Sequence, residues 1–407
     1  MSHSKRPSHE QRSFLGNEQR STTSNRVRVA PALIRWAVDR YGNREELERR
    51  FPQLSGWIQG TAEPTVRQLE AFARVTLTPF GYFFLPEPPR DEIAIPDFRV
   101  RSGGPVRLSA KMQALIGMLQ VRQEWLSEYR QSTGWSRLSF LSKYDTQADP
   151  EEVASDMRAE LGLPSEWPSG ASTREDALAT LIRYAEATGI VVVFNSVLSN
   201  NTHQKLKDED FSGFVLVDAY APFIFINTGR ERTKAAQLFT LAHELAHLWL
   251  GETGISRVPP EAQAEQEVER SCNRIAAAFL MPARSFSVSW ATAQHEPLPQ
   301  RISRLAQQWK ASQSAIVIRA MELNLLDRSR GDPLLGELRR GYEEREEKAT
   351  YAGGDFYRTQ MRRLGRPFVD AVLEALEEEV LSHHEAQELL DMRGKTFNRL
   401  LDRIRGG

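Results

Sequence analysis

The chain has 407 residues, of which 40% are hydrophobic and 26% charged, and its formal net charge is −1. This composition is typical of a globular protein with about two to four domains, and it excludes a uniformly basic chain that coats nucleic acid. The single cysteine, Cys272, excludes an intrachain disulfide and fits a reducing compartment, so we expect a cytoplasmic protein. No apolar run is long enough to span a membrane, and no membrane partner is expected.

The N-terminal quarter of the sequence predicts a tail, a small helical domain and a linker. Residues 1–25 are rich in Ser, Arg, Gln and Asn and lack the apolar segment of a secretory signal, so we expect a disordered tail. Residues 26–90 contain four or five short helical segments separated by breakers, which is the size of a helix-turn-helix domain. Proline and charge mark residues 91–112 as a linker.

A basic surface on the helical domain would suit DNA, since residues 26–90 contain ten arginines against seven acidic residues. The candidate recognition helix, around residues 52–59, carries no arginine or lysine. Arginine is the commonest reader of bases, so the sequence favours weak specific readout and leaves a structural or protein-docking role open. The candidate DNA contacts are Arg44, Arg49, Gln53, Ser55 and Gln59.

The central region predicts helices around a small sheet. Thr173 and Asp176 form a capping-box pattern at the start of a helix that Gly189 ends. Three segments rich in β-branched and aromatic residues then predict strands, and only AYA separates the last two, which indicates a hairpin. These strand segments are 190–197, 211–218 and 222–228, and helices are expected from about 231 to 250 and 261 to 280. We therefore expect an α+β fold, mostly helical, with the sheet packed on a helix.

The stretch FTLAHELAHLWL, residues 239–250, places three titratable side chains in an otherwise apolar helix. His243 and His247 are four residues apart, so their imidazoles share one helix face and can bind one zinc ion. Glu244, beside the first histidine, is placed to act as the general base for a water molecule. Buried His and Glu side chains without partners would cost several kcal/mol, and a metal ion supplies that partner.

A catalytic zinc site needs three protein ligands and one open position, so a third ligand is expected on the next helix. The candidates there are Glu261, Glu265, Glu267 and Glu269. We favour Glu269, which lies 22 positions after His247 at the point where the helix becomes apolar. Cys272 lies three residues further on and stays open as a fourth ligand, but a buried core thiol is favoured because catalysis needs the open position.

FTLAHELAHLWLG, followed by ERSCNRIAAAFLMP, resembles the ImmA/IrrE family of bacterial metallopeptidases over roughly residues 170–330. The resemblance implies a gluzincin-like core with one zinc ion, in which His243, His247 and Glu269 are ligands and Glu244 is the base. Cys272, Ile275 and Phe279 depart from the residues most common in the family, as packing changes. Residues 26–90 resemble the XRE-like helix-turn-helix domain that precedes this peptidase in many members.

These inferences divide the rest of the chain into a zinc metallopeptidase domain (113–299), a helix-turn-helix-like segment (300–331) and a helical C-terminal region (332–407). We expect a zinc-dependent endopeptidase of the HExxH type that cleaves a partner regulatory protein, of the repressor type, in a stress or mobile-element response. A substrate strand could add to an exposed edge of the sheet. The alternative is a DNA-binding transcriptional regulator or antitoxin-like protein whose peptidase fold serves for partner recognition.

Overall fold

The computed structural model describes residues 25–89, 109–198, 204–206, 211–251, 255–256, 263–346 and 356–405. Nearly all of the predicted tail and of the predicted linker lies outside these residues. The chain divides into two compact units, Met1–Asp91 and Glu92–Gly407.

The N-terminal unit contains the short helices that the sequence predicts. They are α1 (Pro31–Tyr41), α2 (Arg44–Arg50), α3 (Leu54–Gln59), α4 (Val66–Thr76) and the 3₁₀ helix η1 (Phe80–Phe84). Local signals set their starts: Asn43 caps α2, and Thr65 forms a capping box with Gln68 at the start of α4. Trp57, Phe72 and Phe83 lie at the centre of the core of this unit.

The second unit is built on a four-stranded sheet in the order β1-β3-β2-β4. The strands are β1 (Val191–Asn195), β2 (Gly213–Leu216), β3 (Phe223–Asn227) and β4 (Ile255–Ser256). β2 and β3 pair antiparallel, as the predicted hairpin requires, and β1 pairs parallel to β3. The two-residue strand β4, which pairs with β2, was not expected. The α+β prediction is confirmed.

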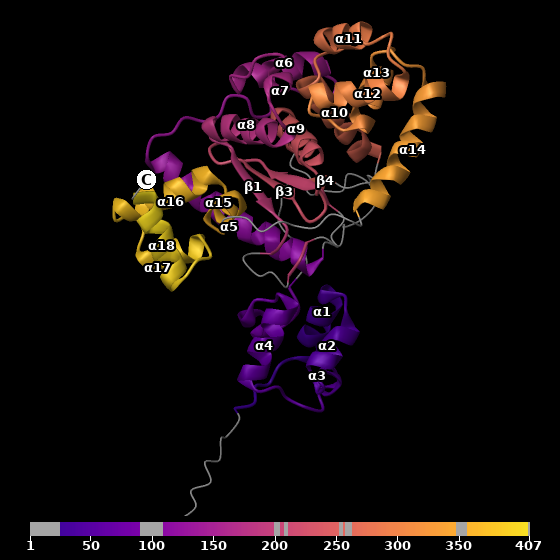
Figure 1. The fold of residues 1–407 in the computed structure, drawn as a ribbon. Helices are drawn as coiled ribbons and strands as arrows, with labels where there is room; N and C mark the ends of the chain where they lie inside the picture. Colours follow the sequence, from indigo (N-terminus) through magenta and orange to yellow (C-terminus); the bar gives the residue numbers. More distant parts are fainter. Residues whose placement is uncertain are drawn as a thin grey trace, which may run out of the picture. The chain divides into compact units, whose positions relative to one another are not determined.

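Helices cover both faces of this sheet, which explains why β1 and β3 are buried throughout and apolar up to a final asparagine, instead of alternating. In Figure 1, α8 and α9 lie on one face and α5 on the other. The bounds are α5 (Ala110–Ser132), α6 (Pro150–Glu160), α7 (Trp167–Gly170), α8 (Arg174–Ala187), α9 (Lys234–Leu250) and α10 (Gln263–Leu280). The capping box of Thr173 and Asp176 is present at the start of α8.

Helix α9, which carries the histidine motif, has defined ends. It begins three residues later than expected because Thr233 has extended backbone and its side chain accepts a hydrogen bond from the Ala236 N–H. It ends at Gly251, whose φ of 69° is a left-handed conformation that glycine adopts without steric cost.

The helices that follow share the hydrophobic core of α9 and α10. They are α11 (Ala283–Thr292), α12 (Leu298–Gln308), α13 (Gln313–Glu322) and α14 (Arg328–Glu346). Ser312 caps α13, as the sequence predicts. Ile302 of α12 and Ile316 of α13 belong to the same buried cluster as Leu245 of α9. The predicted helix-turn-helix-like segment is therefore packed into the core of the second unit.

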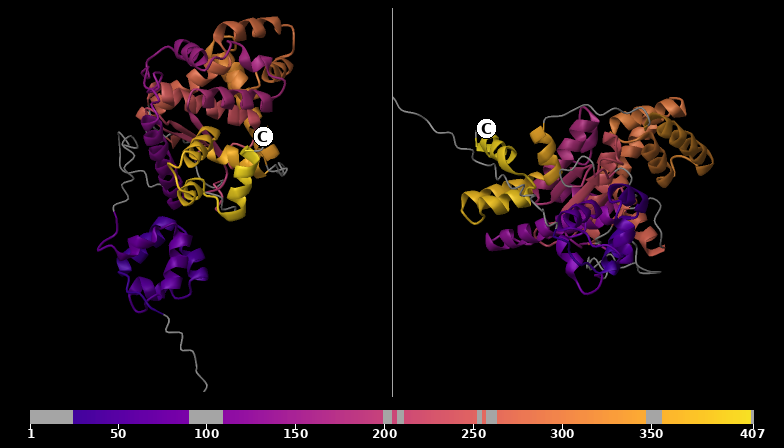
Figure 2. Two further views of the ribbon diagram at one scale, coloured as in Figure 1. Left: turned by 90° about the vertical axis from the view of Figure 1, so that its left-hand side faces the viewer. Right: turned by 90° about the horizontal axis from the view of Figure 1, so that it is seen from below.

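The C-terminal helices, drawn in yellow in Figure 2, belong to the second unit, and α15 and α16 contact strand β1. They are α15 (Phe356–Leu364), α16 (Arg366–Glu377), α17 (His383–Leu389) and α18 (Gly394–Arg405). Gly365 packs so closely on β1 that an added Cβ would collide with the side chain of Val191. Helices α15 and α16 contact β1, and β4 pairs with Gly213 and Phe214 of β2. The addition of a substrate strand to an exposed edge of the sheet stays a prediction.

Candidate metal centre

Helices α9 and α10 pack against each other and bring three predicted ligands together. The ligand atoms of His243, His247 and Glu269 all lie within 4.8 Å of one another. The two imidazole Nε2 atoms are 3.1 Å apart. Glu269 Oε2 is 3.1 Å from His243 Nε2, and Glu269 Oε1 is 3.4 Å from His247 Nε2. Both histidines are buried, at 5% and 1% exposure.

These separations fit the chemistry of a small divalent cation. Zinc binds imidazole nitrogen and carboxylate oxygen at about 2.0–2.2 Å in a tetrahedral array, which places neighbouring ligand atoms about 3.3 Å apart. The three donors of the cluster are 3.1 to 3.4 Å apart, so they can share one ion without moving far. Two nitrogens and a carboxylate oxygen are also a donor set that zinc accepts.

Asn273, one helical turn after Glu269 on α10, orients the first histidine. Its Oδ1 lies 3.1 Å from His243 Nδ1 and can only accept a hydrogen bond. His243 Nδ1 therefore donates, which leaves the lone pair of Nε2 facing Glu269 in the neutral ring. A lone pair that faces a carboxylate is repulsive unless a proton or a metal ion lies between them. Sequence reasoning missed this role of Asn273, although its spacing of four residues from Glu269 places both on one helix face.

The electrostatics of the cluster show the same need for positive charge. Burial lowers the pKa of His243, but the hydrogen bond and the negative charge of Glu269 outweigh this effect and raise it above 6.5. Burial raises the pKa of Glu269, but its hydrogen bonds to His243 and His247 dominate and lower it to about 2. The carboxylate thus stays ionised and attracts a cation to the two imidazoles.

Glu244 is fully buried next to these ligands, and its carboxylate lies against strand β2. A Cβ at Gly213 of that strand would lie 2.6 Å from Glu244 Oε1. Sequence reasoning missed this contact because nothing near Gly213 in the sequence indicates which side chain lies opposite.

The other candidate ligands on α10 are placed differently. Glu267 is exposed, and its Oε1 accepts a hydrogen bond from Gln147, as expected for a side chain on the other side of the helix. Glu261 and the side chain of Glu265 lie outside what the structure describes. Cys272 is buried in the hydrophobic core and is not part of the three-residue cluster found among the described residues.

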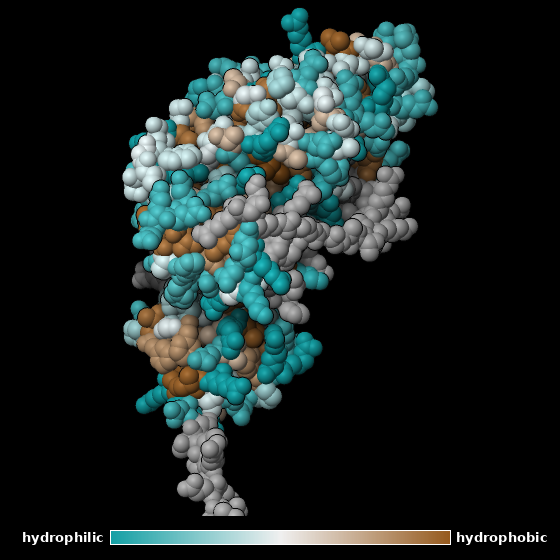
Figure 3. All heavy atoms as spheres, turned by 60° about the vertical axis from the view of Figure 1, so that its left-hand side comes forward, coloured by the Kyte–Doolittle hydropathy of each residue, from teal (hydrophilic) through white to brown (hydrophobic). Residues whose placement is uncertain are grey.

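The candidate DNA contacts of the N-terminal unit are all exposed: Arg44 and Arg49 on α2, and Gln53, Ser55 and Gln59 at the start and along α3. Arg44 pairs with Glu48 at 2.8 Å, and Gln53 Oε1 accepts a hydrogen bond from Gln68. The same unit exposes aromatic side chains of η1, Phe80 at 37% and Phe84 at 54%. Apolar areas interrupt the hydrophilic surface in Figure 3.

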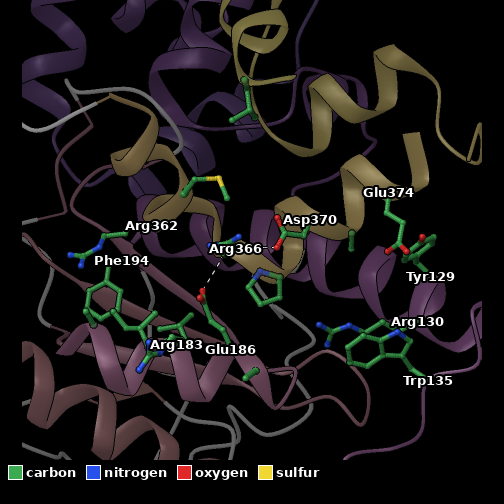
Figure 4. Close-up of a pocket in the computed structure, with 18 residues that line it drawn as sticks. Tyr129, Arg130, Trp135, Arg183, Glu186, Phe194, Arg362, Arg366, Asp370 and Glu374 are labelled. Carbon is green, nitrogen blue, oxygen red and sulfur yellow. Dashed lines mark hydrogen bonds and ion pairs between the residues drawn. The ribbon is translucent and has the colours of Figure 1, made fainter. Parts of the chain in front are cut away.

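A separate cavity of about 840 Å³ lies where α8 and β1 meet the C-terminal helices, and none of the three cluster residues lines it. Figure 4 shows Glu186 of α8 pointing at the start of α16, where its Oε1 accepts a hydrogen bond of 3.1 Å from the backbone N–H of Arg366. Burial raises the pKa of Glu186 to about 7, against the opposing effect of this hydrogen bond.

Comparison with known families locates the cluster within a recognised domain. Residues 364–403 match a domain of unknown function, DUF8813, which covers α16, α17 and most of α18. Among curated proteins, none matches the sequence. No helix among the described residues is long and apolar enough to cross a membrane. Residues 185–321 match the IrrE N-terminal-like domain of the Peptidase_M78 family, so the part of the chain that contains α9 and α10 is similar to a family of metallopeptidases.

Proposed function

We propose that this protein is a zinc-dependent endopeptidase of the HExxH type. The observation that carries the proposal is the convergence of His243, His247 and Glu269 within 4.8 Å, with the buried carboxylate of Glu244 beside them. The match of residues 185–321 to a metallopeptidase family supports the same reaction class.

The three ligands would hold the ion, and Asn273 would keep the ring of His243 in place through Nδ1. A zinc ion bound there supplies Lewis acidity for the peptide carbonyl and lowers the pKa of water. Glu244 accepts a proton from the attacking water and then donates it to the nitrogen of the leaving amine. The apolar side chains of α9 around this carboxylate exclude bulk water, which strengthens both proton transfers.

We propose a protein substrate, a partner regulator of the repressor type in a stress or mobile-element response. The family resemblance of the sequence motivates the substrate class. The test compares peptides released in cells that contain the wild-type protein or Glu244→Gln. A repressor fragment present only with the wild type supports the proposal. Identical peptide sets, or purified protein that binds no stoichiometric zinc, contradict it.

A second candidate function is DNA binding by the N-terminal unit, motivated by the four short α-helices and the exposed polar side chains of α3. A gel-shift assay with DNA from upstream of the gene tests it. A shift that Ser55→Ala and Gln59→Ala abolish supports regulation at DNA, and the aromatic side chains of η1 favour protein docking if no shift occurs.

A further inference from the structure

Gly213 of β2 lies where a side chain has no room. It faces α9 from within the sheet, between Ile226 of β3 and Ser256 of β4. A Cβ at this position would be 2.6 Å from Glu244 Oε1 and 3.0 Å from its carboxyl carbon. Its φ lies outside the left-handed region, so the backbone conformation of the strand does not require glycine there.

The missing side chain leaves the space that the carboxylate of Glu244 occupies. Glu244 is fully buried, so its carboxylate cannot turn to solvent to avoid a new neighbour. Val215, two residues along the strand, faces the same core as α9 with a branched side chain. On this strand, Val215 therefore fills its position in the core with a side chain, whereas Gly213 leaves its position to the carboxylate.

We propose that Gly213 is a positioning residue for the reaction: its lack of a Cβ sets where the Glu244 carboxylate lies relative to His243 and His247. The inference rests on the proposed peptidase function, but the contact itself can be tested without activity. None of the three atoms nearest to a Cβ at Gly213 belongs to His243, His247 or Glu269, so a methyl group there should displace the base and leave the ion bound.

Gly213→Ala is expected to lower kcat about 10–100-fold, because a displacement of about 1 Å in a catalytic group can cost that much. KM should change less than about threefold, and one zinc ion per chain should remain. In the Glu244→Gln background, Gly213→Ala should cause no further loss of kcat, since the base is already gone. Gly331→Ala is the matched control, because its Cβ would collide with Met321 away from the cluster, and kcat per folded molecule should stay unchanged.

The Cβ would also lie 2.9 Å from the carbonyl oxygen of Phe225, so Gly213→Ala also strains the strand itself. The second measurement is thermal unfolding of Gly213→Ala alone and with Glu244→Ala, which removes the carboxylate and leaves Phe225 in place. A smaller loss of Tm in the Glu244→Ala background supports the contact. Equal losses of Tm in the wild-type and Glu244→Ala backgrounds overturn the contact, because the strand itself, and not the carboxylate, then requires the glycine.

The two failures can be distinguished. An inactive wild-type protein contradicts the proposed function, while the thermal cycle still decides the contact between Gly213 and Glu244. An active wild-type protein together with Gly213→Ala of equal kcat overturns only the positioning role.

Discussion

The cluster on α9 and α10 and the exposed face of α2 and α3 both present polar side chains that the sequence singles out, but their surroundings differ. His243 and His247 are buried and converge with Glu269 on one point. Ser55 and Gln59, in contrast, are both exposed to solvent. A buried polar group needs a partner to offset its desolvation, whereas an exposed one is satisfied by water.

Burial therefore decides how strongly a polar sequence motif constrains the function of its side chains. Because the side chains of the histidine motif are buried, they need a cation as partner. Substitutions there should therefore have large effects. Exposure leaves the candidate DNA contacts compatible with several roles, and substitutions there should be nearly silent for stability. The following experiments test that contrast.

The largest effect is expected for Glu244→Gln, which keeps the size of the side chain and removes its basicity. We expect peptide cleavage to fall about 10²–10⁴-fold, the usual contribution of general acid–base catalysis. The metal content should not change, because Glu244 is not among the three clustered ligands. Measurement of kcat and zinc per chain checks both points. Unchanged cleavage would remove the catalytic difference between the two regions.

The next effect concerns the residue that orients His243. Asn273→Ala removes the acceptor for His243 Nδ1, and we expect zinc affinity to fall about 10–100-fold, as is typical when such a partner is lost. Competition with a chelator measures the affinity. Glu267→Gln on the same helix is the control, since Glu267 is exposed and contacts Gln147 instead. Equal affinity for Asn273→Ala and the control would contradict the orienting role.

A smaller effect is expected at the contact between the core and the C-terminal helices. The pKa of Glu186 in the folded chain is about 7, above its ordinary value of 4.5. Between pH 4.5 and 7, the folded chain therefore keeps a proton on this carboxyl that the unfolded chain has lost. The contribution of Glu186 to the free energy of unfolding is fully present below pH 4.5 and is lost as the pH rises through 7.

Glu186→Gln keeps an acceptor for the N–H of Arg366 and removes this titration. We expect the variant to be more stable than the wild type at pH 8 by about 1 kcal/mol, after allowance for partial exposure, and the gain should vanish at pH 4. Denaturant unfolding at both pH values measures it, with the exposed Glu175→Gln on the same helix as control. An equal gain in the free energy of unfolding at pH 4 and pH 8 would contradict the titration of Glu186 as its cause.

The smallest effects are expected on the exposed face of α3. Ser55→Ala and Gln59→Ala should change the free energy of unfolding by less than about 0.5 kcal/mol, because neither side chain is buried. Peptide cleavage in vitro should also stay the same. Thermal unfolding and cleavage assays check this, and a large loss in either would show that the contrast between the two regions is wrong.

The helices and the hairpin could be predicted because their signals are local. Thr173 and Asp176 form the expected capping box, and His243 and His247 share a face by spacing alone. The two-residue strand β4 could not be predicted, since two residues carry no periodicity. The contact of α15 with β1 and the space that Gly213 leaves for Glu244 depend on residues far apart in the sequence. Such contacts follow from the assembled fold and leave no local pattern.

The most direct test of the metal centre is the zinc K-edge X-ray absorption spectrum of the full chain loaded with one equivalent of zinc. The geometry of His243, His247 and Glu269 predicts two imidazole nitrogens and carboxylate oxygen at about 2.0–2.2 Å, and Glu269→Ala should change the oxygen shell. A sulfur ligand at about 2.3 Å, which only Cys272 or a methionine could supply, or a spectrum that Glu269→Ala leaves unchanged, would contradict the assignment.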